Sequence, residues 1–430
     1  MMIKINPSLL KGQITASPSK SYTHRAVILA SLCNGKSKIE NPLLSRDILA
    51  TIESCKSLGA TISVEKSMII EGKMPLKVPD NIIDVSNSGT TLRLVSSMSA
   101  LTLKGYSIFS GDDSIRNRPM QPLLDALHSL GVRCWSTRLN GCAPLIIEGG
   151  GILGGSTTIS GLISSQFLSS LLISAPLAQK KTLIKLSDKL VSRPYVDATL
   201  KVIQHFGGKI IEDNDGAFKI PPLQNYTSQS FNVPGDFSSA SFILAGAALS
   251  DSEISVNGLN FQLPQGDESI INILKQMGAI LTVNTDKGEV IVQGTKTLLG
   301  GKFNLSNSPD LLPVLAILAC KCKDEVVIHG VKHARFKETD RIAVLAKELP
   351  KLGVSIEELE DGLKIRGTNN LKQCTLNAYG DHRMAMAFTI IGLASQEGCK
   401  IIGFESVDIS YPKFEEDIHS LGGKLEEVDN

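Results

Sequence analysis

The sequence predicts an α/β protein of two lobes, each built from three copies of one structural unit. The first observation is a sequence pattern that occurs six times: a helical apolar segment, a glycine, and then a β-like segment. The second is a polar helix start that recurs between the copies of this pattern. The third is the length of 430 residues, which is too great for one compact core. Because each copy holds both helices and strands, and because the repeat is too long for a common solenoid, the α/β class follows.

The recurring glycines predict six helix ends. A glycine just after a helix can adopt the positive φ that closes the last turn, and the alternating residues that follow indicate a strand. Successive copies are separated by roughly 70 to 76 residues, which makes the repeat regular along the whole chain. In chain order the glycines are Gly59, Gly131, Gly207, Gly278, Gly353 and Gly422.

The polar helix starts predict six apolar helices. In chain order these segments span residues 17–32, 86–101, 161–178, 234–249, 308–320 and 380–394. Backbone N–H groups are unsatisfied at the start of a helix, so a phosphate or carboxylate is favoured there. Several starts also carry Lys or Arg within the first two turns, as in SKSYTHR and DHR. We therefore expect an anion site where these helix starts converge.

The segment HARFKETDR places Arg335, Lys337 and Arg341 around the carboxylate of Glu338, ahead of an apolar helical pattern. We expect this helix to begin near Thr339. A helix start favours anions through its free N–H groups and its dipole, so the segment predicts a second concentration of anion-binding groups.

The composition restricts the class of partner. With 44 basic and 43 acidic side chains the net charge is +1, so the chain as a whole attracts neither nucleic acid nor an acidic membrane. The N-terminus lacks the apolar run of a signal peptide, and no apolar run approaches the length of a membrane span. The eight cysteines form no CxxC pair and the histidines add no ligand-spaced pair, so no metal is expected. We expect a cytoplasmic protein with reduced thiols.

Two short motifs resemble nucleotide sites but lack the required context. GGGILG, residues 149–154, is followed by the strand-like STTIS and by no acidic residue at the expected distance, so we interpret it as a turn between strands. In PSKS, residues 18–21, a serine occupies the position where a P-loop needs glycine.

Taken together, the motifs resemble the EPSP synthase (3-phosphoshikimate 1-carboxyvinyltransferase) family over essentially the full length. The resemblance rests on PSKSYTHR, NSGTTLR, RNRP, SSQ, SRPY, PGDFSSAS, SPD, KETDR and DHRMAM, in the family's order. It implies a two-lobed enolpyruvyl-transferase-like fold, with three βαβαββ-type units in each lobe around a cleft. It also implies that residues 1–18 join residues 236–430 in a discontinuous lobe carrying Asp310, KETDR and DHR. Residues 19–235 would then form the lobe that binds mainly shikimate 3-phosphate.

The resemblance implies one reaction and two small-molecule partners. The enolpyruvyl group of phosphoenolpyruvate would be transferred to the 5-hydroxyl of shikimate 3-phosphate, with release of phosphate, by addition and elimination through a tetrahedral intermediate. This is a step of the shikimate pathway, in aromatic amino-acid and chorismate biosynthesis. No cofactor is implied, and members of the family are commonly monomers.

The resemblance also assigns residues. The implied shikimate 3-phosphate ligands are Lys20, Ser21, Arg25, Ser164, Ser165, Gln166, Ser192, Asp310 and Lys337. The implied phosphoenolpyruvate ligands are Lys20, Gly89, Arg118, Gln166, Arg341 and Arg383. Asp310 would take the proton of the attacking hydroxyl, Glu338 would move a proton to and from the methylene carbon, and Lys20 completes the catalytic set.

Two positions depart from the family pattern, and two alternative functions remain open at this point. Many relatives have a lysine where this chain has Ile409, and some have asparagine at the position of His333. The sister enolpyruvyl transferase acting on UDP-N-acetylglucosamine carries Lys-Asn where this chain has Lys20-Ser21, and usually a cysteine in a loop that here reads GDDSIRNRPM. A non-catalytic anion-binding protein would gain nothing from carboxylates such as Asp310 and Glu338 in its site.

Overall fold

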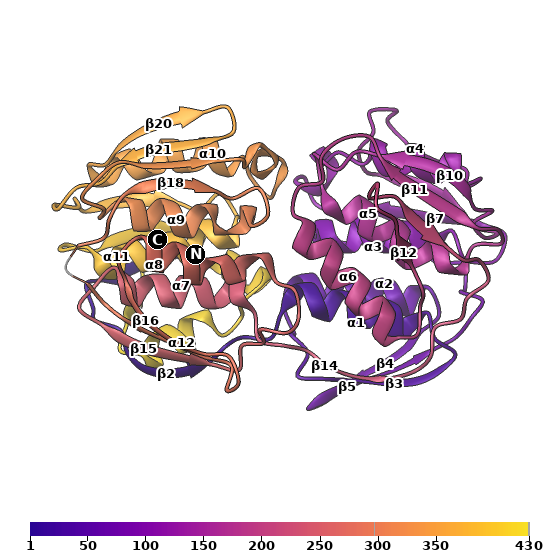
Figure 1. Ribbon diagram of the computed structural model, residues 1–430, viewed down its shortest axis with the longest axis horizontal. Helices are drawn as coiled ribbons and strands as arrows, with labels where there is room; N and C mark the ends of the chain where they lie inside the picture. The colour runs from indigo at the N-terminus through magenta and orange to yellow at the C-terminus, as the bar shows by residue number, and fades with distance from the viewer. Residues whose placement is uncertain (296, 429–430) are drawn as a thin grey trace. The chain divides into compact units, whose positions relative to one another are not determined.

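The computed structural model describes residues 1–295 and 297–428. The chain forms two compact units, shown in Figure 1. The first unit combines Met1–Ser19 with the described residues from Pro234 onward, and the second unit is Lys20–Val233. Each unit holds three four-stranded sheets within the described ranges, so the predicted α/β class with six repeated units is confirmed.

One topology is repeated in all six sheets of the described chain. The outermost strand pairs parallel with its neighbour, and the next two pairings are antiparallel. The sheets of the second unit are β14 (Ser230–Asn232), β3 (Gly35–Glu40), β5 (Ser67–Gly72), β4 (Thr61–Val64); β6 (Ile83–Asp84), β7 (Tyr106–Ser110), β9 (Leu145–Glu148), β8 (Cys134–Ser136); and β10 (Gly155–Ile159), β11 (Thr182–Leu186), β13 (Phe218–Ile220), β12 (Ile211–Glu212).

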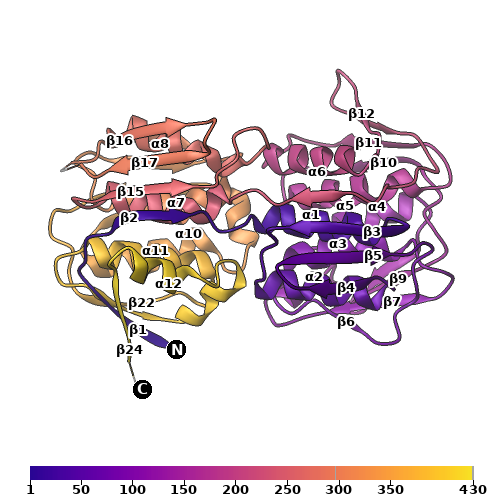
Figure 2. The same cartoon turned by 90° about the horizontal axis from the view of Figure 1, so that it is seen from below.

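The first unit repeats this strand order with help from the N-terminus. Its sheets are β2 (Lys11–Thr15), β15 (Glu253–Asn257), β17 (Glu289–Gln293), β16 (Ile280–Asn284); β18 (Gly301–Asn304), β19 (Val326–His329), β21 (Gly362–Arg366), β20 (Ser355–Leu359); and β22 (Cys374–Asn377), β23 (Cys399–Ile402), β1 (Met2–Asn6), β24 (Lys424–Glu427). Figure 2 shows β2 beside β15, with which it pairs in parallel. β1 lies between β23 and β24, so both ends of the chain contribute to one sheet.

The six predicted helix ends are confirmed by the backbone. Every recurring glycine has a positive φ, between +83° and +107°. Each is followed by the antiparallel edge strand of its sheet: β4, β8, β12, β16, β20 or β24. The GGGILG segment runs between β9 and β10, as expected for a turn between strands.

The polar helix starts open six buried helices, three in each unit. These are α1 (Lys20–Ser31), α3 (Gly89–Ser99), α5 (Ser165–Ser174), α7 (Phe237–Ala248), α9 (Leu312–Ala319) and α11 (His382–Ala394). Nearly every side chain in α7, α9 and α11 is buried, which explains why these sequences are apolar on all faces.

A second set of six helices covers the sheets. These are α2 (Arg46–Ser57), α4 (Gln121–Ser129), α6 (Arg193–His205), α8 (Ile270–Gln276), α10 (Arg341–Glu348) and α12 (Phe414–Ser420). Each has one buried and one exposed face, as the apolar spacing predicts. Across the described residues, no helix is both long and apolar enough to span a membrane.

Candidate active site

In the first unit, the polar residues of the predicted site gather around the guanidinium of Arg341. This side chain is 1% exposed, and its Nε donates to Asp381 Oδ2 at 2.8 Å. Nη1 donates to Asp310 Oδ1 and Nη2 to Glu338 Oε2, both at 2.7 Å. Burial alone would lower the pKa of Arg341, but the carboxylates of Asp381, Glu338 and Asp310 raise it. Arg341 therefore stays charged and fixes both predicted catalytic carboxylates.

Asp310 is contacted by three cations. Besides Arg341, its carboxylate lies 3.2 Å from Arg383 Nη2 and 3.4 Å from Lys337 Nζ. Burial lowers the pKa of Lys337, and Asp310 opposes this shift by stabilising the charged ammonium. The structure thus brings together four predicted residues from three separate motifs.

The starts of α7, α9 and α11 meet at this point. Arg383 Nη1 donates to Ser238 Oγ at 2.5 Å, which links α11 to α7, and Arg383 Nη2 reaches Asp310 just before α9. Asp267 is also buried here; burial, and then the charge of Asp310, raises its pKa to about 6. Convergence of the helix starts within this unit is therefore confirmed.

The helix after KETDR begins slightly later than the sequence predicts. α10 starts at Arg341 and is capped by Asp340, whose carboxylate accepts from Ala343 N at 3.0 Å. The prediction that Arg335 surrounds Glu338 is wrong. Arg335 Nη1 instead lies 2.8 Å from both Asp340 and Glu358, because the second oxygen of the Asp340 cap and the Glu358 carboxylate attract it.

His333 and Ile409, the two residues that depart from the family pattern, are both buried. His333 is 6% exposed, and burial, followed by the charge of Lys337, lowers its pKa to about 4. Its ring is therefore neutral near pH 7. Ile409 ends the short helix η7 (Phe404–Ile409) and is 6% exposed, packed as an ordinary apolar side chain.

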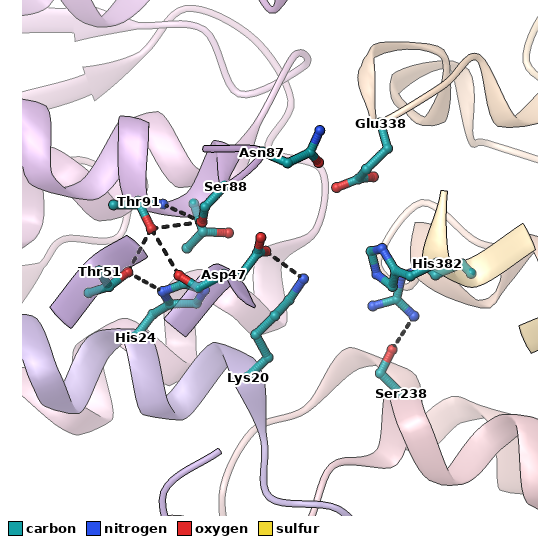
Figure 3. Close-up of polar contacts among 12 residues, drawn as sticks. Lys20, His24, Asp47, Thr51, Asn87, Ser88, Thr91, Ser238, Glu338 and His382 are labelled. Carbon is teal, nitrogen blue, oxygen red and sulfur yellow. Dashed lines mark hydrogen bonds and ion pairs between the residues drawn. The ribbon is translucent and has the colours of Figure 1, made fainter. Parts of the chain in front are cut away.

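In the second unit, Lys20 is the first residue of α1 and pairs with Asp47 of α2. Its Nζ lies 3.0 Å from Asp47 Oδ2, as Figure 3 shows. The Asp47 side chain is 5% exposed and that of Lys20 16%. The ammonium is thus oriented by a carboxylate, and the Lys20 side chain keeps some exposure to solvent.

Arg25, one turn further along α1, is held by backbone and hydroxyl oxygens. Nε donates to Thr199 Oγ1 at 2.7 Å, Nη1 to the carbonyl of Ser21 at 2.8 Å, and Nη2 to the carbonyl of Tyr195 at 3.0 Å. Burial lowers its pKa to about 10, so it remains charged at neutral pH. These contacts join the SKSYTHR and SRPY motifs.

Gln166 links the starts of α5 and α3. Its Oε1 accepts from Arg93 Nη1 at 2.8 Å and its Nε2 donates to Thr90 Oγ1 at 2.9 Å. Ser164 caps α5 by accepting from Gln166 N at 3.3 Å, and Ser165 is the first, buried residue of this helix. The SSQ and NSGTTLR motifs are therefore neighbours in the fold.

Gly89 and Arg118 are in close contact. A Cβ added to Gly89 would lie 2.4 Å from Arg118 Nη1, so a larger residue here would displace the guanidinium from this position. Arg118 is 5% exposed, and its Nη2 donates to Ser114 Oγ at 3.1 Å and to Asn87 Oδ1 at 3.5 Å. Ser192, which precedes α6, adopts the left-handed region with φ of 55°. That conformation is uncommon for serine and indicates a constrained loop.

Three contributing residues escaped sequence reasoning. Asp47 orients Lys20, Asp381 orients Arg341 and caps α11 at Arg383 N, and Ser238 contacts Arg383. Asp381 stood in the GDHR motif, where an acidic residue ahead of an apolar helix signals a cap. Ser238 lies in the PGDFSSAS motif at a predicted helix start, whereas Asp47 lies outside all of the motifs. Among the described residues, no group of three or more His, Cys, Asp or Glu side chains is arranged to hold a metal ion.

Comparison with known proteins identifies the family. The model of the family described as EPSP synthase (3-phosphoshikimate 1-carboxyvinyltransferase) matches residues 5–418. The chain belongs to this family. The resemblance drawn from the nine motifs is therefore confirmed.

Relatives within the EPSP synthase family cover nearly the whole chain. The 3-phosphoshikimate 1-carboxyvinyltransferase of Methanocaldococcus jannaschii is 46% identical over 420 residues, with 97% of each chain covered. That of Nitrosopumilus maritimus is 46% identical over 431 residues, covering 99% of this chain and 100% of the relative. The EPSP synthase structure from Acinetobacter baumannii aligns with a TM-score of 0.82 at 27% identity, covering 99% of this chain and 100% of that one.

Proposed function

We propose that the chain transfers the enolpyruvyl group of phosphoenolpyruvate to the 5-hydroxyl of shikimate 3-phosphate, with release of inorganic phosphate. The observation that carries this proposal is the pairing of two carboxylates, Asp310 and Glu338, on the buried guanidinium of Arg341. Lys337 and Arg383 lie on the same Asp310 carboxylate. An anion-binding protein needs the cations alone, whereas addition and elimination also need groups that move protons.

The reaction requires two proton movements. In the addition, the 5-hydroxyl oxygen bonds to C2 of phosphoenolpyruvate, its proton goes to a base, and C3 gains a proton. In the elimination, the C2–O bond to phosphate breaks and C3 loses a proton, which restores the double bond. Asp310 is the base for the hydroxyl proton, and Glu338 moves the proton at C3. Lys20, fixed by Asp47, adds positive charge at the reacting phosphoenolpyruvate.

The remaining assignments follow the motifs. Shikimate 3-phosphate is bound by Lys20, Ser21, Arg25, Ser164, Ser165, Gln166, Ser192, Asp310 and Lys337, so the unit Lys20–Val233 supplies most of its ligands. Phosphoenolpyruvate is bound by Lys20, Gly89, Arg118, Gln166, Arg341 and Arg383. Each charge-assisted hydrogen bond contributes about 1.5–3 kcal/mol, so several together offset the repulsion between two polyanions.

The decisive experiment measures phosphate release from phosphoenolpyruvate by the purified protein, with and without shikimate 3-phosphate. Release that requires both substrates is expected. A parallel reaction with UDP-N-acetylglucosamine in place of shikimate 3-phosphate tests the sister activity. Binding of both ligands with no phosphate formed would instead support a non-catalytic anion-binding protein.

The role of Glu338 has its own assay. In deuterated water, the wild type is expected to incorporate solvent deuterium at C3 of the enolpyruvyl group. Glu338→Gln keeps the shape of the side chain but holds no transferable carboxyl proton, so incorporation and turnover should both fall, turnover by about 10²-fold or more. Near-normal turnover in this variant would remove Glu338 from the mechanism. Glu360→Gln, at an exposed glutamate of the same unit, is the matched control.

We further propose that the protein acts as a monomer in the cytoplasm. All eight cysteines are free thiols, which is typical of a reducing compartment. Light scattering coupled to size exclusion should give a mass near 46.1 kDa. A mass of twice this value would contradict the monomer.

A further inference from the structure

A line of buried hydrogen bonds crosses from α1 through α2 to the start of α3 (Figure 3). His24 Nδ1 lies 2.7 Å from Thr51 Oγ1, which lies 2.6 Å from Thr91 Oγ1. Thr91 Oγ1 in turn donates to Ser88 Oγ at 2.7 Å. All four residues are 0% exposed. We refer to His24, Thr51, Thr91 and Ser88 as the hydroxyl chain.

The hydroxyl chain has a direction. Thr91 Oγ1 also faces the carbonyl oxygen of Asp47 at 3.4 Å, which can only accept a hydrogen bond. If Thr91 donates its one proton to Ser88 or Asp47, it must accept from Thr51, and Thr51 must accept from His24. The proton of the ring then lies on Nδ1. His24 Nε2 is buried and has no partner among the described residues, and a buried ring nitrogen without a proton is tolerated better than an unpaired N–H.

The surroundings keep the His24 ring neutral. Burial lowers its pKa well below the ordinary value, and the nearby charges of Lys20 and Arg25 lower it further. A neutral ring adds no third positive charge between these two cations. The ring is therefore neutral near pH 7, where one tautomer can persist.

The hydroxyl chain ends on the groups that hold Lys20 and Gly89. Asp47 lies between the two, since its carboxylate binds Lys20 Nζ at 3.0 Å and its carbonyl oxygen lies 3.4 Å from Thr91 Oγ1. Ser88 caps α3 by accepting from Thr91 N at 3.2 Å, and Gly89 is the first residue of that helix. Valines at positions 51 and 91 would fill the same space without any polar group. Simple packing does not require the hydroxyls.

We infer that the hydroxyl chain is a positioning device for phosphoenolpyruvate. It fixes the starts of α1, α2 and α3 against one another, so that the Lys20 ammonium and the N–H groups at the start of α3 keep the arrangement that receives the substrate. The inference rests on the proposed function, in which Lys20 and Gly89 bind phosphoenolpyruvate. His24, Thr51 and Thr91 touch no substrate and act through Asp47 and Ser88.

The first test replaces the middle of the chain. Thr51→Val removes the hydroxyl at nearly constant volume, and it is expected to raise KM for phosphoenolpyruvate about tenfold. KM for shikimate 3-phosphate should rise less, because Lys20 is the only one of its nine proposed ligands that the hydroxyl chain positions. Thr51→Ser returns the hydroxyl and should restore KM. Ser54→Ala is the matched control, because Ser54 lies one turn along α2, is 1% exposed and donates to the Ala50 carbonyl at 2.7 Å. An unchanged KM for phosphoenolpyruvate in Thr51→Val would overturn the inference.

The second test reads the tautomer directly. Imidazole ¹⁵N resonances of the wild type, with His24 assigned from His24→Asn, should show a protonated Nδ1 and an unprotonated Nε2. A proton on Nε2 would overturn the direction of the chain. Absence of phosphate release by the wild type would instead count against the proposed function. In that case, calorimetric binding of phosphoenolpyruvate to the wild type and to Thr51→Val decides the positioning role, with equal affinity overturning it.

Discussion

At the residue scale, Asp310 combines strong local charge with limited access. Its carboxylate lies within 3.4 Å of Arg341, Arg383 and Lys337, yet the side chain is still 13% exposed. The cations hold it in the charged form that a base requires, and the remaining exposure lets a substrate hydroxyl approach. This arrangement supports its proposed role as a base.

Asp310→Asn is therefore expected to lower kcat by roughly 10²–10⁴-fold, with KM for phosphoenolpyruvate nearly unchanged. The amide oxygen can still accept from Arg341 Nη1, whereas the amide NH₂ cannot accept from Arg383 Nη2 as the second carboxylate oxygen does, so one contact is lost together with the base. Steady-state phosphate release measures both constants. Asp324→Asn, at an exposed aspartate of the same unit, controls for the change in net charge. Wild-type turnover in Asp310→Asn would refute the assignment.

His333 provides a pH-dependent contribution to stability. Its pKa is about 4 in the folded protein, against about 6.5 in an unfolded chain. Between these values the unfolded state binds more protons, so the free energy of unfolding should fall as the pH drops from 6.5 towards 4. Removing the ring in His333→Asn should therefore reduce the loss between pH 7 and pH 4.5 by about 2–3 kcal/mol. Urea unfolding at the two pH values measures the difference, and identical losses in both proteins would contradict it.

At the element scale, the starts of the buried helices carry the chemistry. In α11 the charged side chains are confined to the first turn, where caps and free N–H groups lie, and the rest of the helix is apolar apart from Thr389. Asp381 serves both as a cap and as a partner of a site residue, since its carboxylate accepts from Arg383 N and also binds Arg341. A change at a helix start should thus affect substrate binding more than stability.

Gly89→Ala tests this expectation at the start of α3. The new Cβ would lie 2.4 Å from Arg118 Nη1, and the guanidinium must move because it is the flexible end of the contact. KM for phosphoenolpyruvate is expected to rise about tenfold, since Arg118 is a proposed ligand of this substrate. The urea midpoint should change little. Gly216→Ala is the control, because nothing lies within 4 Å of the Cβ it adds and its strain is confined to an exposed turn of the same unit. An unchanged KM in Gly89→Ala would argue against Arg118 as a ligand.

At the scale of the whole molecule, local patterns predicted the fold better than the partners within the site. The six glycines and six helix starts are signals within a few residues, and each marks the element it predicts. The pairing of Lys20 with Asp47 spans 27 residues and that of Arg341 with Asp381 spans 40. Nothing in either motif selects among the many acidic residues, so only the folded chain reveals the partner. The hydroxyl chain could not be predicted from the sequence for the same reason, because an isolated threonine does not indicate which residue it will contact.

The charge distribution of the whole chain leads to the last prediction. The net charge is +1, so no global field draws polyanionic substrates towards the protein, and their attraction must come from local cations. Salt shortens the Debye length from about 10 Å at 0.1 M to about 3 Å at 1 M, but it screens buried groups much less than exposed ones. Arg25 and Arg341 are each 1% exposed. Raising KCl from 0.1 to 1 M should therefore increase KM for either substrate by less than about tenfold, with kcat nearly constant. A rise on the order of 10³-fold, as for ligands held by many exposed phosphate contacts, would show that surface charge dominates binding.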